Sequence, residues 1–320
     1  MNLNINFAKM RPPGFQTRIK ARREELIERV TRGSGWLTVL ACPICGVSNS
    51  KNTKYFEHSS IVSFMCGGCG CLYNDKIPRS VADVYDNAEY LKHTNDTAYV
   101  KEYSYRKERF GAERAEILRK VCGDLTGKRL LDVGCGTGFF LDVMHDYGVV
   151  ADGQEISKPL ASEASERLGV KIFTDLFEDV VPDEKYDIIT MFDLIEHIDK
   201  PLRTLEHAKK LLNKNGVIFV MTPNYKSLAF DAMKSESNLY VPAEHLLFFS
   251  RQTVDFVAKA LGMKVVVYST NGMDVFDMLA YDRDIDGVDI KNSLFLKNIN
   301  EFQNTVNTAQ RANHMRFVLR

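Results

Sequence analysis

Short apolar runs recur between residues 129 and 222, and several are followed by segments with the three- to four-residue apolar spacing of a helix. This alternation predicts an α/β fold, with a doubly wound parallel sheet whose ligands bind at the carboxyl ends of the strands. The expected strands cover 129–133, 149–154, 171–174, 187–192, 217–222 and 264–269. Two helices are expected at 159–168 and 253–261. A third begins after residue 138, and a fourth begins at Pro201, since proline fits the first turn of a helix.

The first of these strands ends in Asp132-Val-Gly-Cys-Gly-Thr-Gly138. Glycines at alternate positions predict a tight turn from strand to helix, with bare backbone at Gly134, Gly136 and Gly138 open to a nucleotide-like ligand. A dinucleotide fold spaces its glycines G-x-G-x-x-G, and the acid Asp132 would repel a phosphate and favour a cation. Glu155, some twenty residues on, ends the second strand, where a carboxylate can accept both ribose hydroxyls.

This stretch resembles the signature of the class I S-adenosylmethionine-dependent methyltransferases, and the chain is identified as a member of that group. The resemblance implies a seven-stranded Rossmann-like sheet that holds S-adenosylmethionine, with Asp175 and Leu176 near adenine and Phe192 near the cofactor. It also implies a final antiparallel strand at 315–319, which makes 272–313 an insertion with a helix at 294–309. The expected organisation is an N-terminal helical segment (1–38), a zinc-binding module (39–80), a helical cap (81–122) and the methyltransferase core (123–320).

The helical cap carries several tyrosines and arginines that could cover the cofactor. Tyr90 and Arg106 are candidates to cap it or to hold its carboxylate, although ordinary core packing explains a single tyrosine equally well. The segment Ser227–Val241 is expected to form a mobile lid over the substrate.

Five of the seven cysteines fall within residues 42–71. Cys42-Pro-Ile-Cys45 and Cys66-Gly-Gly-Cys69 are two C-x-x-C pairs, the arrangement in which four thiolates hold one structural Zn²⁺. A disulfide is disfavoured by the odd cysteine count and by the expected cytoplasmic location. The module resembles a zinc ribbon, and such a ribbon before this core resembles bacterial sugar methyltransferases.

Two Glu-His pairs follow the predicted strand ends. Glu196-His197 lies in a motif widespread among the related methyltransferases, and Glu244-His245 resembles the acid-base segment of sugar C-methyltransferases, where Pro242 replaces an expected tyrosine. Histidine is the natural proton acceptor near neutral pH. His245 is therefore the first candidate for a catalytic base and His197 the second, with each glutamate in a supporting role.

Lys and Arg together number 42, as do Asp and Glu, so the chain has no net charge to attract nucleic acid or an anionic membrane. The first 40 residues carry eight basic and three acidic side chains, either a contact for a polyanion or, more simply, a solvated amphipathic helix. No apolar run could span a bilayer. The expected substrate is a small polar metabolite, most simply a sugar nucleotide or surface-polysaccharide precursor methylated on carbon or oxygen. An RNA methyltransferase and a non-catalytic S-adenosylmethionine-binding protein remain the alternatives, and no oligomeric state is predicted.

Overall fold

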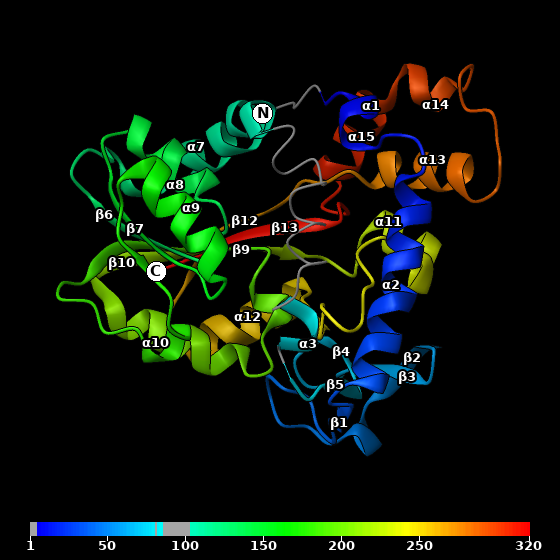
Figure 1. Cartoon of the computed structure of the whole chain (residues 1–320), viewed down its shortest axis with the longest axis horizontal. Helices are drawn as coiled ribbons and strands as arrows, with labels where there is room; N and C mark the ends of the chain where they lie inside the picture. The colour runs from blue at the N-terminus through cyan, green and yellow to red at the C-terminus, as the bar shows by residue number, and fades with distance from the viewer. Residues whose placement is uncertain (1–4, 81, 86–102) are drawn as a thin grey trace.

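The computed structural model describes residues 5–80, 82–85 and 103–320 of the chain (Figure 1). Its central sheet has seven strands in the order β12-β13-β10-β9-β6-β7-β8. The strands are β6 (Arg129–Val133), β7 (Val150–Gln154), β8 (Ile172–Phe173), β9 (Tyr186–Phe192), β10 (Leu212–Pro223), β12 (Val265–Thr270) and β13 (His314–Leu319). Neighbouring strands are parallel except beside β13, which is antiparallel to both β10 and β12. The predicted seven-stranded, mostly parallel sheet is therefore confirmed, including its antiparallel strand.

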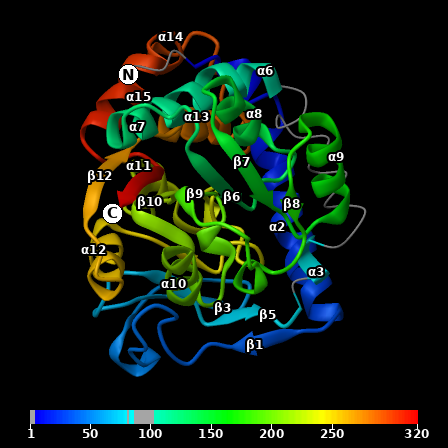
Figure 2. The ribbon, with the colours of Figure 1, turned by 90° about the vertical axis from the view of Figure 1, so that its left-hand side faces the viewer.

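Helices cover both faces of this sheet (Figure 2). One face carries α7 (Ala112–Cys122), α8 (Phe139–Asp146) and α9 (Lys158–Leu168), and the other carries α10 (Pro201–Leu211) and α12 (Arg251–Ala260). Shorter turns are η3 (Phe177–Asp179) and η4 (Ile195–His197), while α6 (Tyr103–Arg106) and the π-helical turn η2 (Lys107–Gly111) lead into α7. Each helix buries one apolar side against the sheet, as the periodicity predicts.

The cysteine-containing module lies against the α12 side of the core. It consists of a two-stranded ribbon, β1 (Trp36–Thr38) with β5 (Lys76–Pro78), the turn η1 (Asn49–Lys51), and a second sheet of order β11-β4-β3-β2. That sheet contains β2 (Thr53–His58), β3 (Ile61–Met65), β4 (Leu72–Asn74) and β11 (Leu247–Phe248). Because β11 lies between β10 and β12 of the main sheet in sequence, the module is completed by a strand from the core, and one cluster of buried side chains runs through both.

The segment expected to be a mobile lid is instead packed into the protein. It forms α11 (Leu228–Met233) and the turn η5 (Lys234–Glu236), and both Phe230 and Tyr240 are fully buried. The ring of Phe56 in β2 meets that of Tyr240 edge to face at 4.7 Å. The expectation of a lid is wrong, because the aromatic residues of this segment fill the space between the core and the module.

The insertion between β12 and β13 differs from its predicted form. It begins with α13 (Asp274–Asp284), which the sequence analysis missed, and the expected single helix is divided at Asn298 into α14 (Leu294–Lys297) and α15 (Ile299–Thr308). Gln303 is buried and accepts a hydrogen bond from the backbone of Val275. These helices form a layer with α1 (Phe7–Met10).

The N-terminal helix α2 (Phe15–Arg32) runs from this layer to the cysteine module (Figure 1). Leu26 and Val30 are buried against a cluster that includes Val84 of α3 (Ala82–Tyr85). Arg23 is also buried and donates hydrogen bonds to the backbone of the α11–η5 region. None of the described helices has both the length and the apolar character needed to cross a bilayer.

Candidate active site

The glycine loop connects β6 to α8 at the carboxyl edge of the sheet. Gly134, Gly136 and Gly138 all have positive φ angles, which only glycine adopts without strain. A Cβ atom on Gly134 would stand 3.0 Å from Leu194, whereas one on Gly136 would meet no atom within 4 Å. The loop therefore leaves open space beside bare backbone, which suits a ligand that approaches the main chain closely.

Glu155 closes one side of this loop from the end of β7. Its carboxylate accepts a hydrogen bond from the backbone N–H of Gly136 at 3.0 Å and another from Ser157 at 2.8 Å. Burial raises the pKa of Glu155. A carboxylate oxygen can accept more than one hydrogen bond, so both oxygens remain able to receive ribose hydroxyls.

Asp132 is buried beneath the loop and accepts a 2.6 Å hydrogen bond from the hydroxyl of Thr190 in β9. Burial raises the pKa of Asp132 to about 7. The buried guanidinium of Arg114 opposes this rise, and it also lies over the ring of Phe192 at 4.4 Å. Arg114 therefore stands beside two predicted cofactor residues, although the sequence analysis did not select it.

The other predicted cofactor residues lie at different places along the carboxyl edge of the sheet. Asp175 and Leu176 are exposed after β8, and the backbone oxygen of Asp175 accepts a hydrogen bond from Gln154. Tyr90 and the side chain of Arg106 lie outside the residues that the structure describes. Their roles stay predictions.

Four cysteine sulfurs meet in the module. The Sγ atoms of Cys42 and Cys69 are 3.5 Å apart, those of Cys45 and Cys66 are 3.3 Å apart, and all four lie within 4.8 Å of one another. A tetrahedral zinc with bonds of about 2.3 Å separates its sulfur ligands by roughly 3.8 Å. The four cysteines thus have the chemistry and the spacing to hold one metal ion, and all four thiolates would be used, which leaves no open position for catalysis.

The two predicted histidines lie together at the strand ends, with ring centroids 4.8 Å apart. The Nδ1 atom of His245 lies 2.5 Å from the carbonyl oxygen of Leu239, and that of His197 lies 2.9 Å from the carbonyl oxygen of Glu244. A carbonyl can only accept, so Nδ1 of His245 carries the hydrogen and its Nε2 presents a lone pair. Nδ1 of His197 also lies 2.7 Å from the hydroxyl of Tyr85, which can donate or accept. Burial lowers the pKa of both rings, to about 3 for His197, which keeps them neutral near pH 7.

The two glutamates make different contacts. The carboxylate of Glu244 is bonded to Arg22 of α2, and no described contact joins it to either imidazole ring. Glu196 is completely buried and accepts a 2.9 Å hydrogen bond from Thr222, while its other oxygen lies 3.9 Å from Nε2 of His197. Backbone carbonyls, and not the glutamates, thus bond the two rings, while the charge of Glu244 raises the pKa of His245. The supporting role of each glutamate stays a prediction.

The sequence analysis missed several residues of this edge. His314, the first residue of β13, brings Nε2 to 3.5 Å from the carboxylate of Asp193, and Tyr85 of α3 brings its hydroxyl to 2.7 Å from Nδ1 of His197. Asn74, the last residue of β4, donates a 3.0 Å hydrogen bond to the backbone oxygen of His245. Each comes from a segment without a recognisable motif, so no sequence signal points to it.

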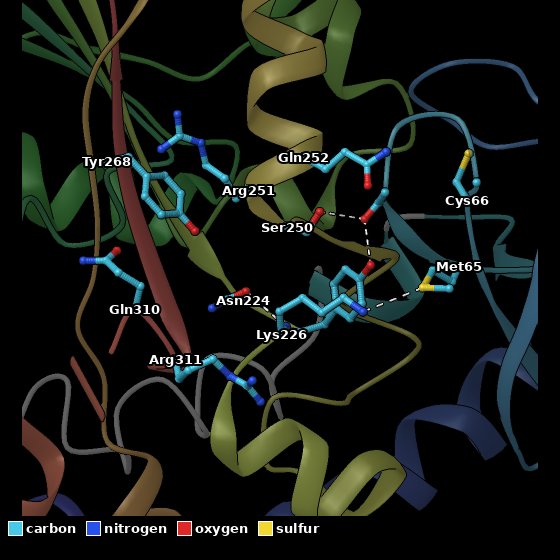
Figure 3. A pocket seen from close by; sticks show the side chains of 13 residues that line it. Met65, Cys66, Asn224, Lys226, Ser250, Arg251, Gln252, Tyr268, Gln310 and Arg311 are labelled. Atoms are coloured by element: carbon cyan, nitrogen blue, oxygen red, sulfur yellow. Dashed lines mark hydrogen bonds between the residues drawn. The ribbon is translucent and has the colours of Figure 1, made fainter. Parts of the chain in front are cut away.

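A cavity of about 720 Å³ opens between the second cysteine pair and the amino end of α12 (Figure 3). Its lining includes three cationic side chains, Lys226, Arg251 and Arg311, with the ring of Tyr268. Arg251 and Arg311 are paired with Asp255 and Asp231, whereas the described residues provide no carboxylate partner for Lys226. The cavity therefore favours a polar, anionic ligand group.

Comparison with known proteins gives a consistent result. Residues 103–268 match the family model described as a methyltransferase domain. The chain is 31% identical over 150 residues to a ubiquinone biosynthesis O-methyltransferase of Pasteurella multocida, which covers 42% of this chain and 60% of that protein. It is 33% identical over 122 residues to the protein of the same name from Actinobacillus pleuropneumoniae, which covers 35% and 52%. The chain thus spans between about half and three fifths of the length of these relatives.

Solved structures with a similar arrangement include a SAM dependent methyltransferase from Archaeoglobus fulgidus. The identity is 16%, the match covers 68% of this chain and 98% of that chain, and the TM-score is 0.47.

Proposed function

Because the chain belongs to the methyltransferase-domain family and is an S-adenosylmethionine-dependent methyltransferase, we propose that it methylates carbon or oxygen of a small polar metabolite. Within this class, we propose a sugar nucleotide or a surface-polysaccharide precursor. The proposal rests on the titratable residues where the strands end and on the cationic side chains of the cavity beside the module.

The observation that carries the proposal is the state of His245. Its Nδ1–H is held by the carbonyl of Leu239, so Nε2 is free to accept a proton, and its lowered pKa keeps it neutral. Bound S-adenosylmethionine supplies an electrophilic methyl group. As the bond from the acceptor atom to the methyl carbon forms and the sulfur–carbon bond breaks, His245 takes the proton that the acceptor loses.

The remaining residues of the edge position the reactants in this proposal. The glycine loop, Asp132 and Glu155 hold the cofactor, while His197 packs edge to face against His245 and limits its movement. The cationic side chains of the cavity would suit the diphosphate of a nucleotide-linked sugar. A structural Zn²⁺ on Cys42, Cys45, Cys66 and Cys69 would fix the module on which the His245 segment rests.

The named relatives support a second candidate, O-methylation of a phenolic compound in ubiquinone biosynthesis. The same base would serve, because a phenol also loses one proton on methylation. These relatives match only 42% and 35% of this chain, so their substrate is carried over here only as a second candidate.

Transfer of radiolabelled methyl groups tests both candidates with one panel of acceptors, composed of UDP-sugars, dTDP-sugars and a catechol. We expect a sugar nucleotide to be labelled, and His245→Ala to lower turnover by about 100-fold, the usual contribution of a general base. S-adenosylmethionine affinity should be unchanged. His207→Ala is the matched control, because this histidine also contacts a backbone carbonyl but lies away from the site.

Labelling of the catechol alone would move the assignment to the second candidate. Turnover of a sugar nucleotide that survives His245→Ala would exclude the proposed base.

A further inference from the structure

The cavity between the second cysteine pair and α12 has only positive charges on its walls. Its charged lining residues are Lys226, Arg251 and Arg311, and none of the described residues that line it is an aspartate or a glutamate. Its volume of about 720 Å³ is that of a small-molecule site. The amino end of α12, which carries a partial positive charge, faces the same space (Figure 3). An anion would therefore be favoured in this cavity.

Lys226 is the cation most available to such an anion. Its Nζ atom lies 4.8 Å from the centre of the Tyr225 ring and 3.8 Å from the sulfur of Met65. Tyr225 is buried, and its hydroxyl donates a 2.8 Å hydrogen bond to the backbone oxygen of Gly70, which fixes the position of the ring. Neither a ring nor a thioether neutralises the ammonium, so Lys226 is held in place with at least two hydrogens left to donate.

The two arginines are paired with carboxylates, but the pairs leave some guanidinium donors unused. Nε of Arg251 lies 3.0 Å from both carboxylate oxygens of Asp255, and no described residue accepts a hydrogen bond from its terminal nitrogens. Arg311 bonds Asp231 through one terminal nitrogen. The side chains of both pairs are exposed, and exposed ion pairs contribute little to stability. A ligand can therefore share either guanidinium at small cost.

The cations lie on different sides of the cavity, which bears on the kind of anion. Figure 3 shows Arg251 and Arg311 toward the side of Tyr268. Lys226 extends instead toward Met65 of the cysteine module. Two linked phosphate groups present oxygen atoms over a longer span than a single phosphate or carboxylate does. A diphosphate is therefore the anion best suited to contact more than one of these cations.

The cavity also borders the strand ends where the candidate base lies. Asn224 of its lining follows β10 directly, and its backbone N–H donates a 2.9 Å hydrogen bond to the backbone oxygen of Asn313, the residue before His314. Ser250, another lining residue, caps α12 and ends the short segment that leads from His245 through β11. One extended ligand can thus have its anionic group in the cavity and its reacting group at the strand ends.

We propose that this cavity is the subsite for a diphosphate group of the methyl acceptor, with Lys226 and Arg311 as its specificity-determining residues. The assignment of the diphosphate to the acceptor rests on the proposed function. Such a subsite selects acceptors linked to a nucleoside diphosphate over free sugars and phenols, which carry no phosphate.

Calorimetric titration of the full-length protein with UDP, pyrophosphate and uridine tests the subsite directly. We expect pyrophosphate to bind, and UDP to bind at least about tenfold more tightly than uridine, because each charge-assisted hydrogen bond can supply that factor. Lys226→Gln removes the charge and keeps a polar side chain, so it should lower the affinity for UDP about tenfold and leave that for uridine unchanged.

Lys214→Gln is the matched control. Lys214 is an exposed lysine near the amino end of β10, the strand whose carboxyl end leads to Lys226, and it also has no carboxylate partner among the described residues. This variant should bind UDP as the wild type does. Lys226→Arg keeps the charge and should retain the affinity for UDP to within about threefold.

The Arg311–Asp231 pair offers a test with opposite signs. Asp231→Asn removes the carboxylate that competes for Arg311, so it should raise the affinity for UDP about threefold, whereas Arg311→Gln should lower it. A fall in both variants would show that the pair only supports the wall of the cavity, and would overturn the assignment of Arg311.

Equal affinity for UDP and uridine would overturn the subsite. So would a loss of affinity for UDP in Lys214→Gln as large as that in Lys226→Gln, since the effect would then come from the overall charge of the protein.

Kinetics with the radiolabelled methyl group identify the source of the diphosphate. If it belongs to the acceptor, UDP should compete with the sugar nucleotide, and Lys226→Gln should raise KM about tenfold with kcat within about threefold, as expected when binding energy common to ground and transition states is lost. UDP that binds through Lys226 without competing would belong to a separate phosphorylated ligand, and the assignment to the acceptor would fail.

The same assay separates this inference from the proposed function. A sugar nucleotide that Lys226→Gln methylates with the wild-type KM would overturn the subsite and leave the proposed function intact. Labelling of the catechol alone, with UDP still bound through Lys226, would overturn the proposed substrate and leave a diphosphate site.

Discussion

The two halves of the candidate site are built in different ways. Most of the cofactor half comes from one continuous stretch, from β6 through the segment after β8, whose consecutive strands lie side by side, with Arg114 of α7 and Phe192 of β9 beside it. The acceptor half is assembled from α2, β4, α3, η4, the segment before β11 and the start of β13. The first half depends on local turn chemistry, and the second depends on the packing of the whole molecule.

This difference explains the position of the cysteine module. The second cysteine pair leads directly into β4, and β4 pairs with β11, two residues after His245. Asn74 of β4 also bonds the His245 backbone, and the backbone oxygen of Gly70 accepts hydrogen bonds from Tyr225 and Ser250 of the core. The module therefore acts as the scaffold of the acceptor half.

The largest expected effect comes from substituting the cysteines that we propose hold a metal ion in the module. Cys42→Ser together with Cys69→Ser should abolish metal binding and lower turnover by about 100-fold or more, since a displacement of about 1 Å at a reacting group can cost that much. S-adenosylmethionine affinity should change by less than about threefold, because no contact between described residues joins the glycine loop to the module. Elemental analysis, calorimetric titration and the methyl-transfer assay give the three measurements.

Cys122→Ser, which alters a cysteine outside the cluster, should change none of these quantities. If the double variant loses cofactor binding in parallel with turnover, the two halves form one cooperative unit and the comparison above does not hold.

An intermediate effect is expected in the cofactor half. The raised pKa of Asp132, about 7, means that its carboxylate is charged above that pH and becomes neutral below it. Attraction for the cationic cofactor is thus present at pH 8 and is lost as the pH falls through 7. Calorimetric titration at pH 6, 7 and 8 should show affinity that falls with pH.

Asp132→Asn should bind S-adenosylmethionine about tenfold more weakly at pH 8 and show little dependence on pH. Asp124→Asn, which changes an exposed acid, should resemble the wild type. An Asp132→Asn protein with the wild-type pH dependence would place the titrating group elsewhere.

The difference between the cofactor half and the acceptor half also determines which parts of the site the sequence could predict. The strands, the glycine loop and the cysteine pairs follow from spacing within a few residues, so local periodicity and turn chemistry are enough to predict them. His314 and Asn74 gain their roles only through tertiary contacts, and a single histidine before a strand has no pattern to distinguish it. Charge interleaving predicted a solvated face for α2, yet Arg22 and Arg23 reach carboxylate and carbonyl groups brought there by the fold.

The smallest expected effect concerns Arg22, which links α2 to the acceptor half. Burial lowers the pKa of His245 most, Glu244 raises it, and Arg22 lowers it further. Arg22→Gln removes the positive charge and leaves Glu244 unpaired, so the pKa of His245 should rise. Because the base works only when unprotonated, the acid limb of the turnover profile should move to higher pH, with about a threefold loss at pH 6 and little change at pH 8. Glu244→Gln should move the same limb to lower pH. Shifts in the same direction for both variants would show that the ion pair acts by holding the loop in place, and not through the charge felt by His245.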